Sequence, residues 1–208
     1  MTVVVVEDHL MFREAVCKAC REFGHEVVGE TEFGVKAIEL IFATLPDIAI
    51  IDLVLPDLEG FEVIKKIRAS GLATRFLVLS CHTDEYTVFR ALRAGICGFV
   101  DKSTNSLTVL RNALVSLERG GSFFSRAFIE TKLERLADSS CFLRMLSETE
   151  QRVLSLIARG MSDDEIGVRL NIASSTAQTH RRNISQKLDV HGTPKLMAFA
   201  IEHGFANG

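Results

Sequence analysis

Acidic side chains follow two apolar runs in this 208-residue sequence. Glu7 and Asp8 come directly after the run VVVV at residues 3–6, and Asp52 ends the run IAIID at residues 48–52. An acid at the end of a buried apolar run is costly to place unless it has a partner. If the fold brings the three carboxylates together, they repel one another, and a hard divalent cation such as Mg²⁺ relieves the repulsion. We therefore expect Glu7, Asp8 and Asp52 to form a Mg²⁺ site.

Two further polar residues lie at the ends of later apolar runs. Ser80 ends the run RFLVLS at residues 75–80, and Lys102 comes just after the run that contains Phe99. Taken singly, Ser80 fits a strand end, Phe99 fits a core position, and Lys102 fits a solvated surface lysine. Only their combination with the three carboxylates favours a functional site.

Short apolar runs alternate with stretches of helical periodicity. The runs are VVVV at residue 3, EVVGE at 26, IAIID at 48, RFLVLS at 75 and CGFV at 97, and the helical stretches are 9–23, 33–44, 59–69, 84–94 and 105–119. Five such units predict an α/β fold with a doubly wound, five-stranded parallel sheet that is covered on both faces. Functional residues in such a sheet gather at the carboxyl ends of the strands. The acids, Ser80 and Lys102 are therefore expected at one edge.

These residues lie in motifs that resemble the receiver domain of bacterial two-component response regulators, which has a flavodoxin-like fold. The motifs are VEDH, IIDLVLPDLEGFE, LSCH and GFVDKS, in the order and spacing of that family. The resemblance implies that Asp52 is the phosphoacceptor for a sensor histidine kinase. It also implies that Asp8 and Asp52 bind Mg²⁺ directly, that Glu7 binds it directly or through water, and that Lys102 stabilises the transferring phosphoryl group.

The same resemblance implies a conformational switch. A phosphoryl group adds about −1.5 to −2 charges and three acceptor oxygens. Ser80 would move toward it, Phe99 would follow into the vacated space, and the surface around residues 84–94 would change. Pro56 and Gly60 are expected to shape the loop after Asp52. Leu10, Leu55 and Cys81 depart from the family pattern, and none of them removes a reacting group.

Strand signals stop after residue 121. Residues 122–145, which contain ADSS, read as a linker with a weak helix, and helical patterns follow at 147–160, 162–170, 174–188 and 193–203. Two of these helices open with the capping box S-x-x-E, as SETE at residue 147 and SDDE at residue 162, which satisfies free N–H groups at a helix start. The sequence thus predicts a receiver domain at 1–121, a linker at 122–145 and an all-α four-helix domain at 146–208.

The helices at 162–170 and 174–188 are joined by a short turn. This is helix-turn-helix geometry, in which the start of the second helix reaches base edges in the major groove. The segment resembles the LuxR-type DNA-binding domain, and the whole arrangement resembles the NarL/FixJ family of response regulators. The resemblance implies that the helix from Thr193 to His203 contacts a second subunit. It also implies that base edges are contacted by Gln178, Thr179 and Arg182. Backbone phosphates would be contacted by Ser175, Thr176, His180, Arg181, Asn183 and Lys187.

The second helix of this pair departs from the family pattern at two positions. Gln178 stands where lysine is usual, and because Gln prefers adenine edges while Lys and Arg prefer guanine, we expect an altered site preference and a lower non-specific affinity. Ala173 stands where serine often caps the helix, and we expect Ser174 to cap it one residue later. Five apolar residues are expected to pack the pair together: Ile166, Leu170, Ile172, Ile184 and Leu188.

Charge is distributed unevenly along the chain. Lys and Arg number 13 against 17 Asp and Glu in residues 1–122, 4 against 3 in 123–145, and 7 against 7 in 146–208. The first part is therefore acidic and the last is neutral. Within the last part, residues 166–188 hold four cations and no acid, which forms a modest basic patch.

Cysteine use and hydropathy indicate a cellular compartment. The five cysteines are odd in number, the amino terminus lacks the features of a signal peptide, and no apolar run approaches the ~20 residues that span a bilayer. We expect a cytoplasmic protein with reduced thiols and no membrane partner. Cys17 and Cys20 lie in an amphipathic helical stretch, so we interpret them as packing residues.

Several functions compete on this sequence. The leading one is a transcription regulator that forms a homodimer on double-stranded DNA when Asp52 is phosphorylated, with RNA polymerase as a candidate partner. An enzyme is disfavoured, because phosphatases on similar sheets place a second acid two residues after the nucleophile, where this chain has Val54. Another alternative is a phosphorylation-independent DNA-binding regulator whose receiver is a dimerisation module. In a third, the terminal domain serves protein partners.

Overall fold

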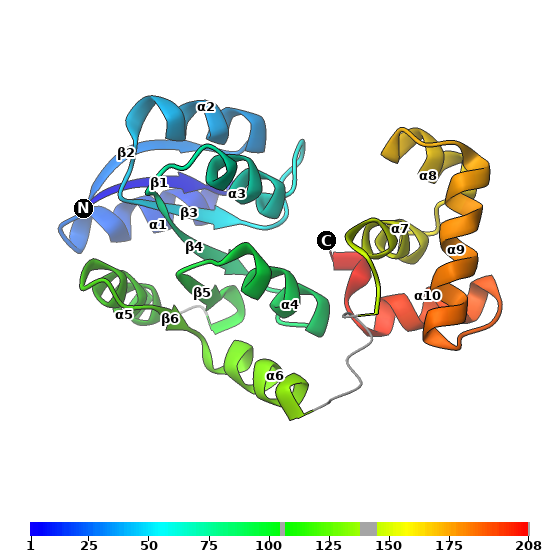
Figure 1. Ribbon diagram of the computed structural model, residues 1–208. Helices are drawn as coiled ribbons and strands as arrows, with labels where there is room; N and C mark the ends of the chain where they lie inside the picture. The colour runs from blue at the N-terminus through cyan, green and yellow to red at the C-terminus, as the bar shows by residue number, and fades with distance from the viewer. Residues whose placement is uncertain (105–106, 138–144, 208) are drawn as a thin grey trace. The chain divides into compact units, whose positions relative to one another are not determined.

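The computed structural model describes residues 1–104, 107–137 and 145–207 (Figure 1). The chain divides into two compact units, Met1–Thr83 with Arg90–Glu130, and Asp84–Phe89 with Thr131–Gly208. The first unit contains the sheet, and the second is helical. Among the described residues, no helix has both the length and the apolar character needed to cross a membrane.

A parallel sheet forms the centre of the first unit. Its strands lie in the order β2-β1-β3-β4-β5-β6, and every neighbouring pair is parallel. The predicted parallel sheet is therefore observed, but it has six strands among the described residues rather than five. The strands are β1 (Thr2–Val6), β2 (Glu26–Thr31), β3 (Ile48–Asp52), β4 (Arg75–Ser80), β5 (Gly98–Asp101) and β6 (Phe123–Phe124).

The extra strand lies within the stretch that was predicted as a linker. β6 pairs with β5 through Phe123 opposite Gly98 and Phe124 opposite Phe99. Two residues are too few to show the alternation by which a strand is identified in a sequence. The missing side chain of Gly98 matters here, because a Cβ at that position would lie 3.1 Å from the Phe123 carbonyl oxygen.

Helices cover both faces of the sheet. In β1, Val3 and Val5 join a core with α1 and α5, while the alternate residues Val4 and Val6 are also buried. Burial of both faces explains why VVVV shows no polar alternation. The elements around the sheet are α1 (Leu10–Glu22), α2 (Gly34–Thr44), α3 (Gly60–Ala69), the 3-10 turn η1 (Lys102–Thr104) and α5 (Leu107–Glu118). Two further helices, α4 (Glu85–Ala94) and α6 (Arg126–Ala137), have residues in both units.

The two cysteines of α1 are packing residues, as expected. Cys17 and Cys20 are buried and free, and Cys17 Sγ donates a hydrogen bond to Glu30 Oε2 at 2.8 Å. Burial raises the pKa of Cys17 to about 12 and that of Cys20 to about 11. Both thiols are therefore protonated and unreactive at neutral pH. Cys141 lies outside the described residues.

The second unit is built from short helices around its own core. Leu154, Ile166, Ile184 and Leu196 are all buried in this core. Ser147 and Ser162 both form the predicted capping boxes. The predicted linker motif ADSS lies mostly outside the described residues. The helical elements are α7 (Glu148–Ala158), α8 (Asp163–Leu170), α9 (Ser174–Leu188), α10 (Thr193–Glu202) and the 3-10 turn η3 (Phe205–Asn207).

Candidate functional site

The carboxyl ends of β1 and β3 bring three acidic side chains together. The strand order reverses between these neighbouring strands, and a doubly wound sheet has a crevice at that point. Glu7 and Asp8 follow β1 and Asp52 ends β3, and one carboxylate oxygen from each lies within 4.8 Å of the others. Glu7 and Asp52 are buried, with exposed fractions of 1% and 5%, whereas Asp8 is exposed. The cluster is therefore open to solvent on the Asp8 side.

Lys102 bridges the two buried acids. It follows β5, and its Nζ lies 2.7 Å from Glu7 Oε2 and 2.7 Å from Asp52 Oδ2. The same Nζ lies 5.0 Å from the centre of the Phe12 ring, a favourable cation–π distance. Lys102 is thus held by side chains from three parts of the fold, and the interpretation as a solvated surface lysine is wrong.

The pKa values of the site reflect burial and mutual charge. Burial raises the pKa of Glu7 and the negative charge of Asp52 adds to this, although the hydrogen bond from Lys102 opposes it. Burial alone would lower the pKa of Lys102, but the charges of Asp52 and Glu7 outweigh it, so that this pKa is raised. The ammonium therefore stays charged at neutral pH.

The donor set fits a hard divalent cation. The cluster offers three carboxyl groups beside a single ammonium, and a divalent ion would offset the excess of acidic groups. Oxygen atoms are the ligands of Mg²⁺, and Mg²⁺ usually keeps several waters. Exposed Asp8 leaves room for such waters.

Ser80 and Phe99 also lie near the carboxyl edge of the sheet, and each has a partner. Ser80 ends β4 with an exposed fraction of 1%, and its Oγ accepts a hydrogen bond from the His82 backbone N–H at 3.1 Å. Phe99 in β5 is fully buried, and its ring centre lies 4.8 Å from that of Phe128 in α6. Phe99 therefore connects the sheet with a helix that was assigned to the predicted linker.

Gly60 lies eight residues after Asp52 in the chain and contacts its backbone. A Cβ at residue 60 would lie 2.2 Å from the Asp52 carbonyl oxygen and 2.9 Å from Leu53 Cα. The Gly60 N–H donates to the Leu53 carbonyl at 2.9 Å. Only glycine allows this approach, which is the physical basis of the predicted loop-shaping role.

Asp57 has a role that was not predicted. Its carboxylate accepts hydrogen bonds from the Gly34 N–H at 2.6 Å and the Val35 N–H at 2.9 Å, at the start of α2. The residue before α2, Phe33, offers no side-chain cap. Asp57 therefore caps α2 from the loop that follows Asp52. Asp57 and Gly34 are more than twenty residues apart in the chain. The sequence therefore indicated only an acid in a turn, and not the helix that this acid caps.

In the second unit, α8 and α9 form the predicted helix-turn-helix. Ile166 and Ile184 are buried between them, and Leu170, Ile172 and Leu188 pack against the same core, as expected. Asn171 ends α8 in a left-handed conformation. A Cβ at Gly167 would lie 2.9 Å from the Ile172 carbonyl oxygen, so this glycine allows the chain to return closely in the turn.

One expectation for the start of α9 is wrong. The helix begins at Ser174 with Ala173 as its N-cap residue, and no side chain caps it. Ser174 does not shift the helix start by one residue. The backbone bond from the Ala177 N–H to the Ala173 carbonyl already fixes the first turn.

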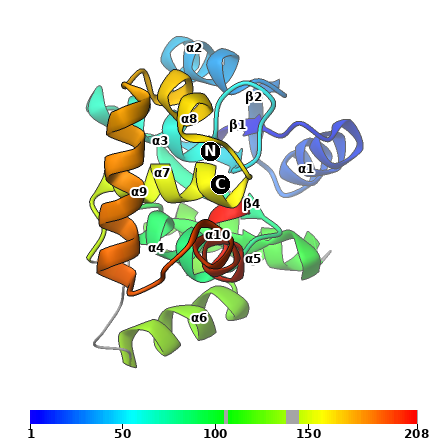
Figure 2. The ribbon, with the colours of Figure 1, turned by 90° about the vertical axis from the view of Figure 1, so that its right-hand side faces the viewer.

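The residues of α9 predicted to meet DNA fall into two groups. Figure 2 shows α9 along one side of the helical unit. Thr179 is exposed, and its Oγ1 donates to the Ser175 carbonyl at 2.9 Å. His180, Arg181 and Asn183 are half-buried. The exposed members are Ser175, Thr176, Gln178, Thr179, Arg182 and Lys187.

Two of the predicted phosphate contacts form ion pairs within the unit. Arg181 Nε lies 2.8 Å from Asp163 Oδ1 at the start of α8. Lys187 Nζ lies 2.7 Å from Glu150 Oε2 at the start of α7. These two cations are therefore engaged with acids of their own unit.

Two family models match separate parts of the chain. Residues 3–114 match the model described as response regulator receiver domain. Residues 144–200 match the model described as bacterial regulatory proteins, luxR family.

Similar proteins cover nearly the whole chain. The virulence-factor transcription regulator BvgA of Bordetella pertussis is 31% identical over 206 residues, which is 98% of this chain and 98% of BvgA. The transcriptional regulatory protein NarL of Mycobacterium tuberculosis is 33% identical over 96% of this chain and 93% of its own. The solved complex of the response regulator RcsB with DNA has a TM-score of 0.65 at 25% identity, covering 97% of this chain and 98% of RcsB.

Proposed function

This chain belongs to the two-component response regulators that join a receiver domain to a LuxR-type DNA-binding domain, and we propose that phosphorylation of Asp52 controls its binding to DNA. As a member of this family it regulates transcription. We assign it no enzymatic activity on other substrates. RcsB has been solved as dimers bound to DNA, which supports double-stranded DNA and a second subunit as partners.

In the proposed reaction, an Asp52 carboxylate oxygen attacks the phosphorus of a phosphohistidine on a sensor kinase. A P–O bond forms, the P–N bond breaks, and its electron pair returns to the imidazole. Mg²⁺, held by Glu7, Asp8 and Asp52, would neutralise charge on the phosphoryl oxygens. Lys102, whose Nζ lies 2.7 Å from Asp52 Oδ2, would stabilise the same oxygens from the other side.

The new phosphoryl group would then act through Ser80 and Phe99. Ser80 Oγ would exchange its bond from the His82 N–H for a bond to a phosphoryl oxygen. Phe99 would move with it and alter its contact with Phe128 of α6. This movement would change the surface of the receiver and favour a dimer.

The DNA-binding unit would read a site through the exposed face of α9. Gln178, Thr179 and Arg182 would face base edges. Phosphates would be held by Ser175, Thr176, His180 and Asn183. The surface of α10 would pair two subunits, and RNA polymerase is a further candidate partner.

The observation that carries this proposal is the bridge of Lys102 between Glu7 and Asp52. Buried acids that repel one another cost stability, so a fold that keeps them has a use for their charge. The alternative, a receiver that serves only as a dimerisation scaffold, gives no reason for such a cluster.

The test measures DNA binding and oligomeric state with and without phosphoramidate plus Mg²⁺. Wild type, Asp52→Asn and, as a matched control, Glu39→Gln on the surface of α2 are compared. We expect the donor to promote dimers and DNA binding in wild type and Glu39→Gln but not in Asp52→Asn. Equal DNA binding by all three proteins with and without donor would favour the scaffold alternative.

A further inference from the structure

We propose that Lys187 and Arg181 are positioning residues, which fix α9 against the starts of α7 and α8, and that they do not neutralise DNA phosphates. This inference rests on the proposed DNA binding of the unit. It reassigns two residues that family resemblance would place among the phosphate contacts.

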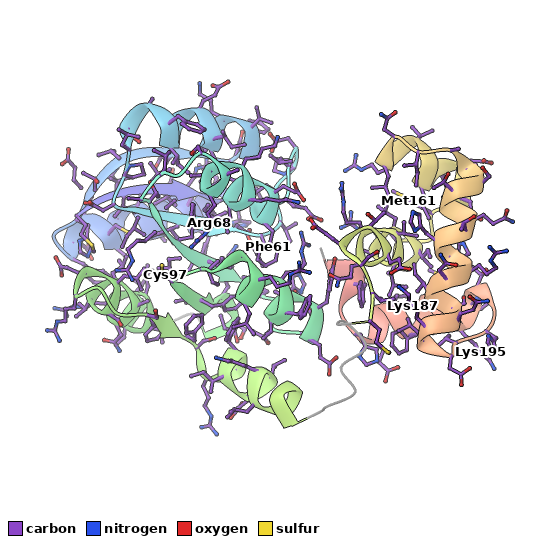
Figure 3. The ribbon with its side chains drawn as sticks, in the orientation of Figure 1. Phe61, Arg68, Cys97, Met161, Lys187 and Lys195 are labelled. Atoms are coloured by element: carbon purple, nitrogen blue, oxygen red, sulfur yellow. The ribbon has the colours of Figure 1, made fainter. Side chains whose placement is uncertain are left out.

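Lys187 pairs with an acid that is almost completely buried. Glu150 is 4% exposed, and its Oε2 accepts hydrogen bonds from Lys187 Nζ at 2.7 Å and from the Ser147 N–H at 2.7 Å. Lys187 lies in the last turn of α9 (Figure 3). Glu150 lies in the first turn of α7. The pair therefore joins the end of α9 to the capping box of α7.

A DNA phosphate would have to take Lys187 from Glu150. The carboxylate would then keep its negative charge in a buried position with only neutral donors, which is unfavourable. Seen from outside, the pair is close to neutral. Lys187 therefore adds little to the attraction between the unit and DNA.

Arg181 of α9 forms a similar ion pair with the start of α8. Its Nε lies 2.8 Å from Asp163 Oδ1, and its Nη2 donates to the Met161 carbonyl at 3.3 Å. Its Nη1 is buried and has no hydrogen-bond acceptor among the described residues. A guanidinium whose nitrogens face its own domain cannot reach a phosphate without leaving this position.

Helical periodicity places Arg181 beside the buried face of α9 and Lys187 at the border of that face. Ala177 and Ile184 are fully buried. Arg181 lies four residues after Ala177 and three before Ile184, so it shares their side of the helix. Lys187 lies three residues after Ile184 and reaches Glu150 from the edge of that side, although it is itself exposed. Gln178 and Arg182, four residues apart, share the opposite, exposed side.

Salt dependence separates the two roles. Each phosphate neutralised by a cation contributes about 0.9 to the slope of log K against log salt. We would measure this slope in NaCl, at fixed Mg²⁺, for the full-length donor-treated protein on mixed-sequence double-stranded DNA. On mixed-sequence DNA, where Arg182 has no specific base edge to read, its exposed charge would neutralise a phosphate, and Arg182→Gln is expected to reduce the slope by about 0.9 per subunit. Lys187→Gln is expected to leave it unchanged.

A second variant releases the lysine without removing the cap. Glu150→Gln keeps the capping box, because glutamine also serves at this position. Lys187 is then free, so the slope should become steeper, by up to about 0.9 per subunit. The double variant Glu150→Gln/Lys187→Gln should return the slope to that of wild type. A reduction of about 0.9 per subunit in Lys187→Gln would overturn the inference.

Thermal unfolding tests the positioning role when DNA binding itself is absent. Failure of wild type to bind DNA would overturn the proposed function but not this inference. Lys187→Gln should lower the melting temperature in the wild-type background and have a smaller effect in the Glu150→Gln background. Equal losses in both backgrounds would mean that the pair has no positioning role.

Discussion

Some residues around Asp52 make contacts that their side-chain type alone does not predict. Gly60 has no side chain, and its backbone lies very close to that of Asp52. A Cβ at residue 60 would come within 2.2 Å of the Asp52 carbonyl oxygen. The position of the Asp52 backbone, the proposed phosphoacceptor, therefore depends on a residue eight places further along the chain. Lys102 acts more visibly, since its charge is shared by Glu7 and Asp52.

Gly60→Ala tests this backbone contact. Because the new Cβ would push against Asp52 and Leu53, we expect a loss of stability of about 1–3 kcal/mol and slower phosphorylation of Asp52. Urea unfolding and the rate of labelling by phosphoramidate measure the two effects. Gly71→Ala is the comparison, since its Cβ would meet nothing within 4 Å and the cost there is only a positive φ of 78°. Normal phosphorylation of Gly60→Ala would contradict the prediction.

Glu150 predicts a pH dependence at the residue scale. Burial would raise its pKa, but hydrogen bonds from Lys187 and Ser147 outweigh burial, so that the pKa is lowered from 4.5. An acid whose pKa is lower in the folded state stabilises the fold above its unfolded pKa, and this stability is lost as the pH falls through the folded pKa. We therefore expect the stability of wild type to fall more steeply below pH 4.5 than that of Glu150→Gln, measured by urea unfolding.

At the scale of elements, some helices carry their own N-terminal caps, and α2 is capped by a residue from elsewhere in the chain. α7 and α8 carry their own capping boxes, in which Ser147 and Ser162 are followed by a glutamate. α2 has no such residue and is capped by Asp57. The loop after Asp52 is thereby attached to a neighbouring helix.

Asp57→Ala should weaken this attachment. Two N–H groups at the start of α2 lose their acceptor, and we expect a loss of about 1 kcal/mol in the free energy of unfolding. Asp57→Asn is the matched control, because asparagine is a comparable cap and should keep most of the stability. Chemical denaturation of the full-length variants measures both. Equal losses in the two variants would show that the negative charge, and not the cap, is what matters.

At the scale of the whole molecule, the two units have different proposed roles. The first holds the acidic cluster at the switch point of its sheet, and the second presents the exposed face of α9. Their proposed chemistry is different, since the first is proposed to attract a cation and a phosphoryl group and the second is proposed to attract DNA. Communication between them is proposed to begin at Ser80 and Phe99.

Mg²⁺ should stabilise the protein through the first unit alone. An ion that binds only the folded state at 100 times its Kd adds about 2.7 kcal/mol. We expect Mg²⁺ to raise the melting temperature of wild type and of Glu39→Gln, and to have a smaller effect on Asp8→Asn. Differential scanning calorimetry makes the measurement. An equal rise in Asp8→Asn would exclude this cluster as the binding site.

Local patterns in the sequence determined the elements and their order. Five strands and their helices were predicted close to their observed ends, because burial periodicity and capping residues are properties of neighbouring positions. The meeting of Glu7, Asp8, Asp52 and Lys102 was also predictable, since the carboxyl ends of parallel strands share one edge.

Contacts between distant residues were decided only by the tertiary structure. The strand β6 exists because β5 offers it a free edge, and α2 is capped because the loop at Asp57 passes beside it. Likewise, Arg181 and Lys187 look like cations of a basic patch until Asp163 and Glu150 are seen beside them. Sequence alone determined which residues carry charge, and folding decided which of those charges remain available to a partner, because ion pairing depends on distances in space.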